Sequence, residues 1–149
     1  ATSSGEIASA SVQPAHLLDD RDITERLWAG RCDRAYPFRW LLDAGVELRF
    51  GSDAPVAPLD PWLAMAAAVH RSADERPPWH GEQALSVAEA LRSSVDGVPA
   101  VAPGGPGDLV LLDEDPLAGA GSLPTGTLAA RLRATPVAAT VVAGRVVHG

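Results

Sequence analysis

The sequence predicts an α/β fold that is followed by a short all-β segment. Two apolar runs, at 8–13 and 46–50, are typical of buried strands, and helical patterns connect and follow them. Gly and Pro then dominate residues 96–107, which predicts a linker, and the helical patterns stop beyond it. We therefore expect an α/β part at 1–98 and a β part at 107–149.

Local signals place the first elements of the α/β part. The first strand ends before Pro14, which cannot donate a ladder hydrogen bond. We expect a loop at 17–20 and a short helix at 22–28. A second helix is expected at 35–44, with Gly45 in the left-handed position just past its end.

Two further helices have clear start signals. Asp60 followed by Pro61 provides an N-cap and a proline at the first helical position, so we expect a helix at 62–71. Ser86 and Glu89 form a capping box ahead of an apolar stripe at helical spacing. The polar, proline-containing segment between these helices is expected to be a loop.

The β part shows strand patterns and turn residues. Strands are expected at 108–112, 137–143 and 145–148. The last two are joined near Ala143-Gly144, which suits a two-residue hairpin turn. Residues 115–126 are expected to form a turn-rich loop.

Composition excludes several classes of function. The 149 residues carry 12 basic and 19 acidic side chains, a net charge of −7, which leaves no basic footprint for nucleic acid. No apolar run approaches the roughly 20 residues of a membrane helix, and no secretory signal is visible. Cys32 is the single cysteine, which excludes an intrachain disulfide and favours a reducing cytoplasm.

Asp53 is the strongest candidate for chemistry. Gly51-Ser52-Asp53 ends the strand at 46–50, and α/β enzymes place their reactive groups at the carboxyl ends of buried strands. An Asp between Ser and Ala-Pro is also a common turn residue. His16 follows the first strand, and a backbone-bound loop histidine and a site residue are equally good interpretations of it.

Other candidates favour structural interpretations. The four histidines show neither i,i+4 nor H-x-H spacing, so they form no zinc signature. The pair Asp19-Asp20 is interpreted as a solvated loop rather than a metal pair. Trp40 is expected in the core, and Trp79, in its proline-rich loop, is the candidate for a lid or rim contact.

A family resemblance extends over nearly the whole chain. The chain resembles the last third of a family 3, YtcJ-like amidohydrolase. The segments that carry this resemblance are Ser11–His16, Arg34–Pro37, Gly51–Val56, Asp60-Pro61, Ala67–Arg71, Gly107–Asp113 and Ala139–Val147. The resemblance implies a distorted TIM barrel, represented here by its last two strands and their helices, with a segment of a small β-sandwich at the C-terminus.

The resemblance also implies a chemistry. Members of the family use zinc or another divalent ion to activate water against an amide-like C–N bond in a small molecule. Asp53 would end the last barrel strand, touch the metal and shuttle the proton from the water to the leaving nitrogen. His16 would face the same barrel mouth and bind substrate.

The family's metal-binding histidines would lie upstream of Ala1. The isolated chain is therefore expected to be an inactive fragment, with the missing N-terminal part of the same protein as its partner and an exposed barrel edge that favours homo-oligomers. The alternative is a standalone, non-catalytic binding or interaction module derived from such an enzyme.

Overall fold

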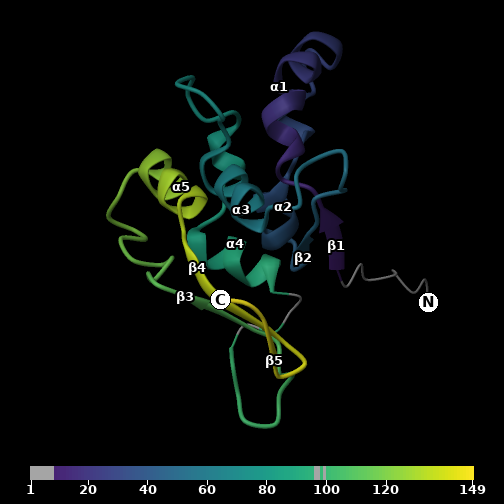
Figure 1. Cartoon of the computed structure of the whole chain (residues 1–149). Coiled ribbons are helices and arrows are strands. Elements are labelled where there is room, and N and C mark those ends of the chain that lie inside the picture. Colours follow the sequence, from purple (N-terminus) through teal and green to yellow (C-terminus); the bar gives the residue numbers. More distant parts are fainter. Residues whose placement is uncertain (1–8, 96–97, 99) are drawn as a thin grey trace, which may run out of the picture.

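The computed structural model describes residues 9–95, 98 and 100–149, which form an α/β structure with two separate sheets (Figure 1). Residues 1–8, 96, 97 and 99 lie outside the described part. The first residue of the strand expected at 8–13 and part of the linker expected at 96–107 therefore cannot be compared. Within the described residues, no helix has the length and apolar character needed to cross a membrane.

The first sheet is a parallel pair of short strands. Strand β1 (Ser9–Val12) runs beside β2 (Glu47–Phe50), with Val12 opposite Phe50. The amide of Gly51 donates to the carbonyl of Val12 at 2.9 Å, so the pairing continues one step past the end of β2. Parallel pairing requires a long crossover between the strands, and here the crossover is helical.

The crossover contains α1 (His16–Leu27), the short 3-10 helix η1 (Cys32–Arg34) and α2 (Phe38–Asp43). The expected loop at 17–20 was wrong, because these residues form the first turns of α1. Leu17 is fully buried at this point, and its burial outweighs the low helix propensity of the neighbouring aspartates.

Helix α3 (Pro61–His70) and helix α4 (Val87–Ser94) begin where the sequence predicts. The side chain of Asp60 accepts hydrogen bonds from the first free amides of α3, and the capping box between Ser86 and Glu89 is formed in both directions. The segment between them also contains a short 3-10 helix, η2 (Gly81–Gln83).

The second sheet is antiparallel, in the order β3 (Leu109–Leu112), β4 (Val137–Val142) and β5 (Arg145–His148). Ala143 and Gly144 both have positive φ, 49° and 75°, which confirms the predicted two-residue hairpin turn.

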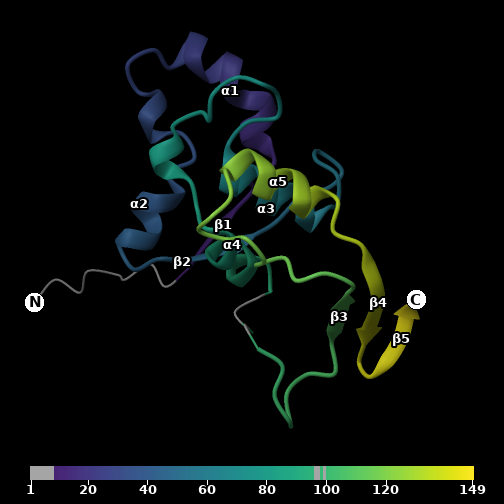
Figure 2. The same cartoon turned by 90° about the vertical axis from the view of Figure 1, so that its left-hand side faces the viewer.

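The expectation that helical patterns stop beyond the linker was wrong, because helix α5 (Thr125–Arg133) follows it, begins within the loop expected at 115–126 and packs against α3. Its buried residues Leu128, Ala129 and Leu132 share a core with α3 and α4. The division into 1–98 and 107–149 stays a prediction, although a helix of the second part belongs to the core of the first. Both views place the antiparallel sheet and α1 at opposite ends of the molecule (Figures 1 and 2).

The burial of two tryptophans is the reverse of what the sequence predicts. Trp79 is only 3% exposed and packs in the core with Leu17 and Phe38, so the prediction of a lid or rim contact was wrong. Trp40 is 47% exposed, so the prediction that it lies in the core was also wrong. Helix α2 has only six residues, and Phe38 supplies its fully buried position instead.

Candidate functional site

The carboxyl ends of β1 and β2 meet at one edge of the parallel sheet. His16 follows β1 by four positions and Asp53 follows β2 by three, so the two predicted site residues come from the same edge. Open α/β sheets bind ligands at this edge, because the loops that leave the strands there can vary while the strands hold them in place.

Asp53 occupies a tight turn directly after β2. Its backbone is left-handed, with φ at 56°, a conformation that Asp adopts more readily than most residues. The carbonyl of Asp53 accepts from the amide of Val56 at 2.9 Å, and the hydroxyl of Ser52 accepts from the amide of Ala54 at 3.3 Å. The peptide bond between Ala54 and Pro55 is cis. Asp53 is exposed in this turn.

A depression of about 330 Å³ lies beside this turn. Its walls come from the end of β2, the start of α3 and the end of α4. The lining residues are Phe50, Gly51, Ser52, Leu59, Asp60, Pro61, Ala64 and Ser94. Asp53 borders the depression in sequence but does not line it. Asp53 is thus exposed, while its neighbours Gly51 and Ser52 line the depression.

His16 differs from Asp53 in its surroundings. Its side chain is half-buried, and its Nε2 atom is enclosed without any hydrogen-bond partner among the described residues. The amide of His16 donates to the carbonyl of Gln13 at 3.2 Å, which fixes the backbone at the start of α1. Buried polar atoms in proteins are almost always paired, so an unpartnered imidazole nitrogen indicates a position where a water molecule or a ligand group belongs.

The described residues do not hold a metal by themselves. They contain no group of three or more His, Cys, Asp or Glu side chains close enough to share an ion. Zinc needs at least three protein ligands when one position is left for water. The donor chemistry of Asp53 and His16 suits a divalent ion, but two donors fall short of a site.

Asp19 and Asp20 lie within α1, so the interpretation of this pair as a solvated loop was wrong. The Asp20 carboxylate is half-buried and accepts a hydrogen bond from the phenol of Tyr36. Burial and this carboxylate together raise the pKa of the Tyr36 phenol, so the phenol stays protonated and continues to donate.

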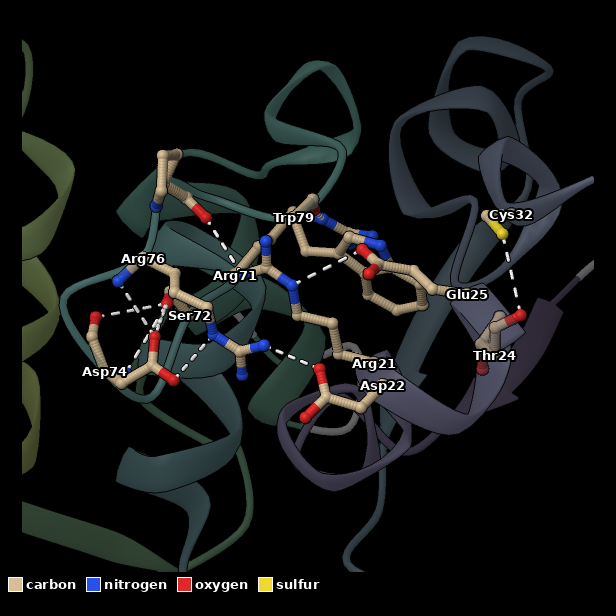
Figure 3. Close-up of polar contacts among 11 residues, drawn as sticks. Arg21, Asp22, Thr24, Glu25, Cys32, Arg71, Ser72, Asp74, Arg76 and Trp79 are labelled. Atoms are coloured by element: carbon tan, nitrogen blue, oxygen red, sulfur yellow. Dashed lines mark hydrogen bonds and ion pairs between the residues drawn. The ribbon is translucent and has the colours of Figure 1, made fainter. Parts of the chain in front are cut away.

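A polar network ties the loop after α3 to helix α1 (Figure 3). Arg76 binds Asp22 of α1 at 2.6 Å and Asp74 of its own loop at 2.8 Å. Arg21 donates to the carbonyl of Pro77 at 3.0 Å. The two contacts to α1 join residues more than 50 positions apart, and the sequence gives no signal that pairs them.

Comparison with known proteins is consistent with the architecture. Residues 5–148 match the model of the amidohydrolase family. The protein named LONG AFTER FAR-RED 3 of Arabidopsis thaliana is 38% identical over 89 residues, which cover 55% of this chain and 15% of that protein. The Bacillus subtilis (strain 168) protein named "Putative amidohydrolase YtcJ" is 30% identical over 90 residues, which cover 58% of this chain and 17% of that protein.

A solved structure gives the same result. The crystal structure of an uncharacterized metal-dependent hydrolase from Pyrococcus horikoshii OT3 is similar with a TM-score of 0.53 and 36% identity, and the match covers 60% of this chain and 19% of that one. The chain spans less than a fifth of the length of each of these three relatives. The family match extends over nearly all of its own residues, and the chain therefore belongs to the amidohydrolase family.

Proposed function

We propose that this chain forms one side of the active site of a metal-dependent hydrolase that cleaves a non-peptide C–N bond, in an amide or a formamide. The observation that carries the proposal is that Asp53 and His16 follow the carboxyl ends of two paired parallel strands in a chain of this family. In this proposal β1 and β2 are the last two strands of a TIM barrel, and β3 to β5 belong to a small β-sandwich.

Asp53 acts as the general base in this proposal. An ionised carboxylate accepts a proton from the water as its oxygen attacks the carbonyl carbon. It then donates this proton to the nitrogen, so that the C–N bond breaks and the nitrogen leaves as a neutral amine. His16 binds the substrate through its unpartnered Nε2 atom.

The metal is a divalent ion, and we propose zinc. When bound, such an ion lowers the pKa of a water molecule and polarises the bond to be broken. Asp53 would supply one ligand, and the remaining ligands would come from polypeptide outside these 149 residues. The same polypeptide would pair with the free edges of the parallel sheet, and the isolated chain, which would otherwise associate with itself through these edges, would be inactive. The free thiol of Cys32 supports a cytoplasmic location.

Complementation tests this proposal. If the encoding DNA continues upstream, the preceding polypeptide is produced separately and mixed with this chain, and hydrolysis of a nitroanilide and an N-formyl substrate is measured with added Zn²⁺. We expect activity from the mixture and none from either part. Asp53→Asn in the mixture should lower kcat by a factor of about 100 to 10,000. Asp113→Asn, which changes an exposed acid outside the site, serves as the matched control.

Two results would contradict the proposal. Full hydrolysis by the isolated chain would show that no other polypeptide is needed. Full activity of the Asp53→Asn mixture would show that Asp53 is not the base.

The absence of a three-ligand group among the described residues favours one alternative, a standalone binding module. A start codon next to Ala1 and a stable, monomeric product would support that alternative.

A further inference from the structure

A second depression lies at the end of α1. Its volume is about 180 Å³, and its lining residues are Trp28, Arg31 and Arg34. It shares no lining residue with the depression beside Ser52. The end of α1 extends away from the body of the molecule in both views (Figures 1 and 2). This second depression, which we call the α1 hollow, has no role in the function proposed above.

Hydrogen bonds within the chain hold the turn that carries the residues of the α1 hollow. Trp28 caps α1, and its amide donates to the carbonyl of Thr24 at 2.8 Å. The carbonyl of Trp28 accepts from the amide of Arg31 at 2.8 Å and from the Cys32 thiol at 3.3 Å. The same thiol lies against Thr24 (Figure 3), and Gly30 supplies the positive φ, 79°, that the turn requires.

The side chains of the α1 hollow offer an aromatic face and two cations. The guanidinium carbon of Arg31 lies 5.9 Å from the centre of the Trp28 ring, and that ring residue is still 50% exposed. Among the described residues, no carboxylate forms an ion pair with Arg31 or Arg34. Two guanidinium groups without an ion pair in the described part of the chain thus lie beside one indole, with Asp33 between them in the sequence, and they can bind an anion.

We propose that the α1 hollow binds a small aromatic carboxylate. The ring of the ligand stacks against the exposed part of the Trp28 indole, and its carboxylate accepts paired hydrogen bonds from the planar guanidinium groups. Arg31 and Arg34 both lie beyond the end of α1 and line the same hollow, with the exposed ring of Trp28 between α1 and η1.

Benzoate is the probe, and NMR of the full chain is the measurement. We expect the indole N–H of Trp28 and the side-chain N–H of Arg31 to shift on titration with benzoate and to saturate. Benzamide has the same shape without the charge, and acetate has the charge without the ring, so both should bind at least about tenfold more weakly. Neither Asp53 nor a metal takes part, so this result is independent of the hydrolase assay.

Variants locate the site. Arg31→Gln should weaken benzoate binding at least about tenfold, because it removes a charged donor pair. Arg26→Gln changes an exposed arginine of α1 that does not line the hollow and should leave binding unchanged. Arg34→Gln is the second test if Arg31→Gln disturbs the fold, as judged by the remaining amide signals.

Three results would overturn the proposal. The first is equal affinity for benzoate and benzamide, which would remove the cations from recognition. The second is unchanged benzoate affinity in both Arg31→Gln and Arg34→Gln. The third is a set of benzoate-induced shifts outside the α1 hollow with none at Trp28.

Discussion

Arg71 is a fully buried charge whose replacement tests how the loop after α3 is held. Its Nε donates to the carbonyl of Trp79 at 2.7 Å, and its Nη1 donates to the carbonyl of Tyr36 at 3.1 Å. The amide of Trp79 returns a bond to the carbonyl of Arg71 at 2.9 Å, so both ends of the loop at 72–78 are joined. The Nη2 atom has no partner among the described residues, and burial lowers the pKa of Arg71 to about 10.

These contacts predict the order of two substitutions. Arg71→Lys keeps a buried charge, but one ammonium replaces a guanidinium that bonds two carbonyls, so a charged hydrogen bond worth about 1.5–3 kcal/mol is lost. We expect a loss of about 2–4 kcal/mol. Arg71→Met loses both bonds, but it also relieves the charge burial, which costs about 3 kcal/mol on the basis of the lowered pKa. We expect a net loss of about 0–3 kcal/mol, so the methionine variant should be the more stable one.

Urea unfolding followed by tryptophan fluorescence measures both values. For a slope of about 2 kcal/mol per molar urea, the midpoint of Arg71→Lys should fall by about 1–2 M. Arg92→Lys, at an exposed position of α4, is the matched control and should stay within about 0.5 kcal/mol of the parent. An unchanged urea midpoint in Arg71→Lys would refute the argument that a guanidinium is needed to bond both carbonyls. A methionine variant less stable than the lysine variant would show that the buried charge is favourable here.

Two further predictions concern pH. Hydrogen bonds from Arg39, at 2.6 and 2.8 Å, lower the pKa of Glu89 to about 2. A lowered acid pKa stabilises the fold above the ordinary value of 4.5, and this stabilisation is lost as the pH falls towards 2. Glu89→Gln should therefore cost about 1–2 kcal/mol of stability at pH 7, after allowance for solvent screening. The urea midpoint of this variant should also fall less than that of the parent as the pH drops from 4.5 towards 2. The same fall in both proteins would contradict this prediction. Burial, with the charge of Arg133, lowers the pKa of His70, which also contacts Thr125 of α5 at 3.0 Å. The folded chain favours the neutral form of His70, so the stability that His70 contributes is present above pH 6.5 and is lost below it. His70→Gln should therefore reduce the fall in Tm between pH 7 and 5. If Tm falls equally with pH in the parent and the variant, His70 is not the cause of that fall.

Elements with strong local signals could be predicted from the sequence. The cap at Asp60 and the capping box at Ser86 fix their helix starts through bonds that span two or three residues, so no distant contact is needed. The turn at Ala143-Gly144 was predictable from Gly144, which adopts positive φ without a steric cost and lies between two strand patterns.

Elements that depend on distant partners could not be predicted. Helix α5 has no cap bond from a side chain, and its buried face is completed only by residues of α3 and α4. Trp79 sits in a polar segment whose composition indicates a loop, yet the bonds from Arg71 draw its ring into the core beside Tyr36. In both cases a contact between remote segments outweighs the local pattern.

The candidate site divides along the same line. Sequence alone placed His16 and Asp53 at the ends of two strands, and the parallel register brings those ends to one edge. It could not show that the Nε2 atom of His16 is enclosed without a partner, since that depends on packing around α1. His16 and Asp53 lack different things for the proposed reaction. The enclosed imidazole of His16 lacks a hydrogen-bonding partner among the described residues, and the exposed carboxylate of Asp53 lacks a surrounding surface that excludes water. Under the proposed function one event supplies both, because polypeptide that pairs with the free edge beside β2 would enclose Asp53 and carry the substrate to His16.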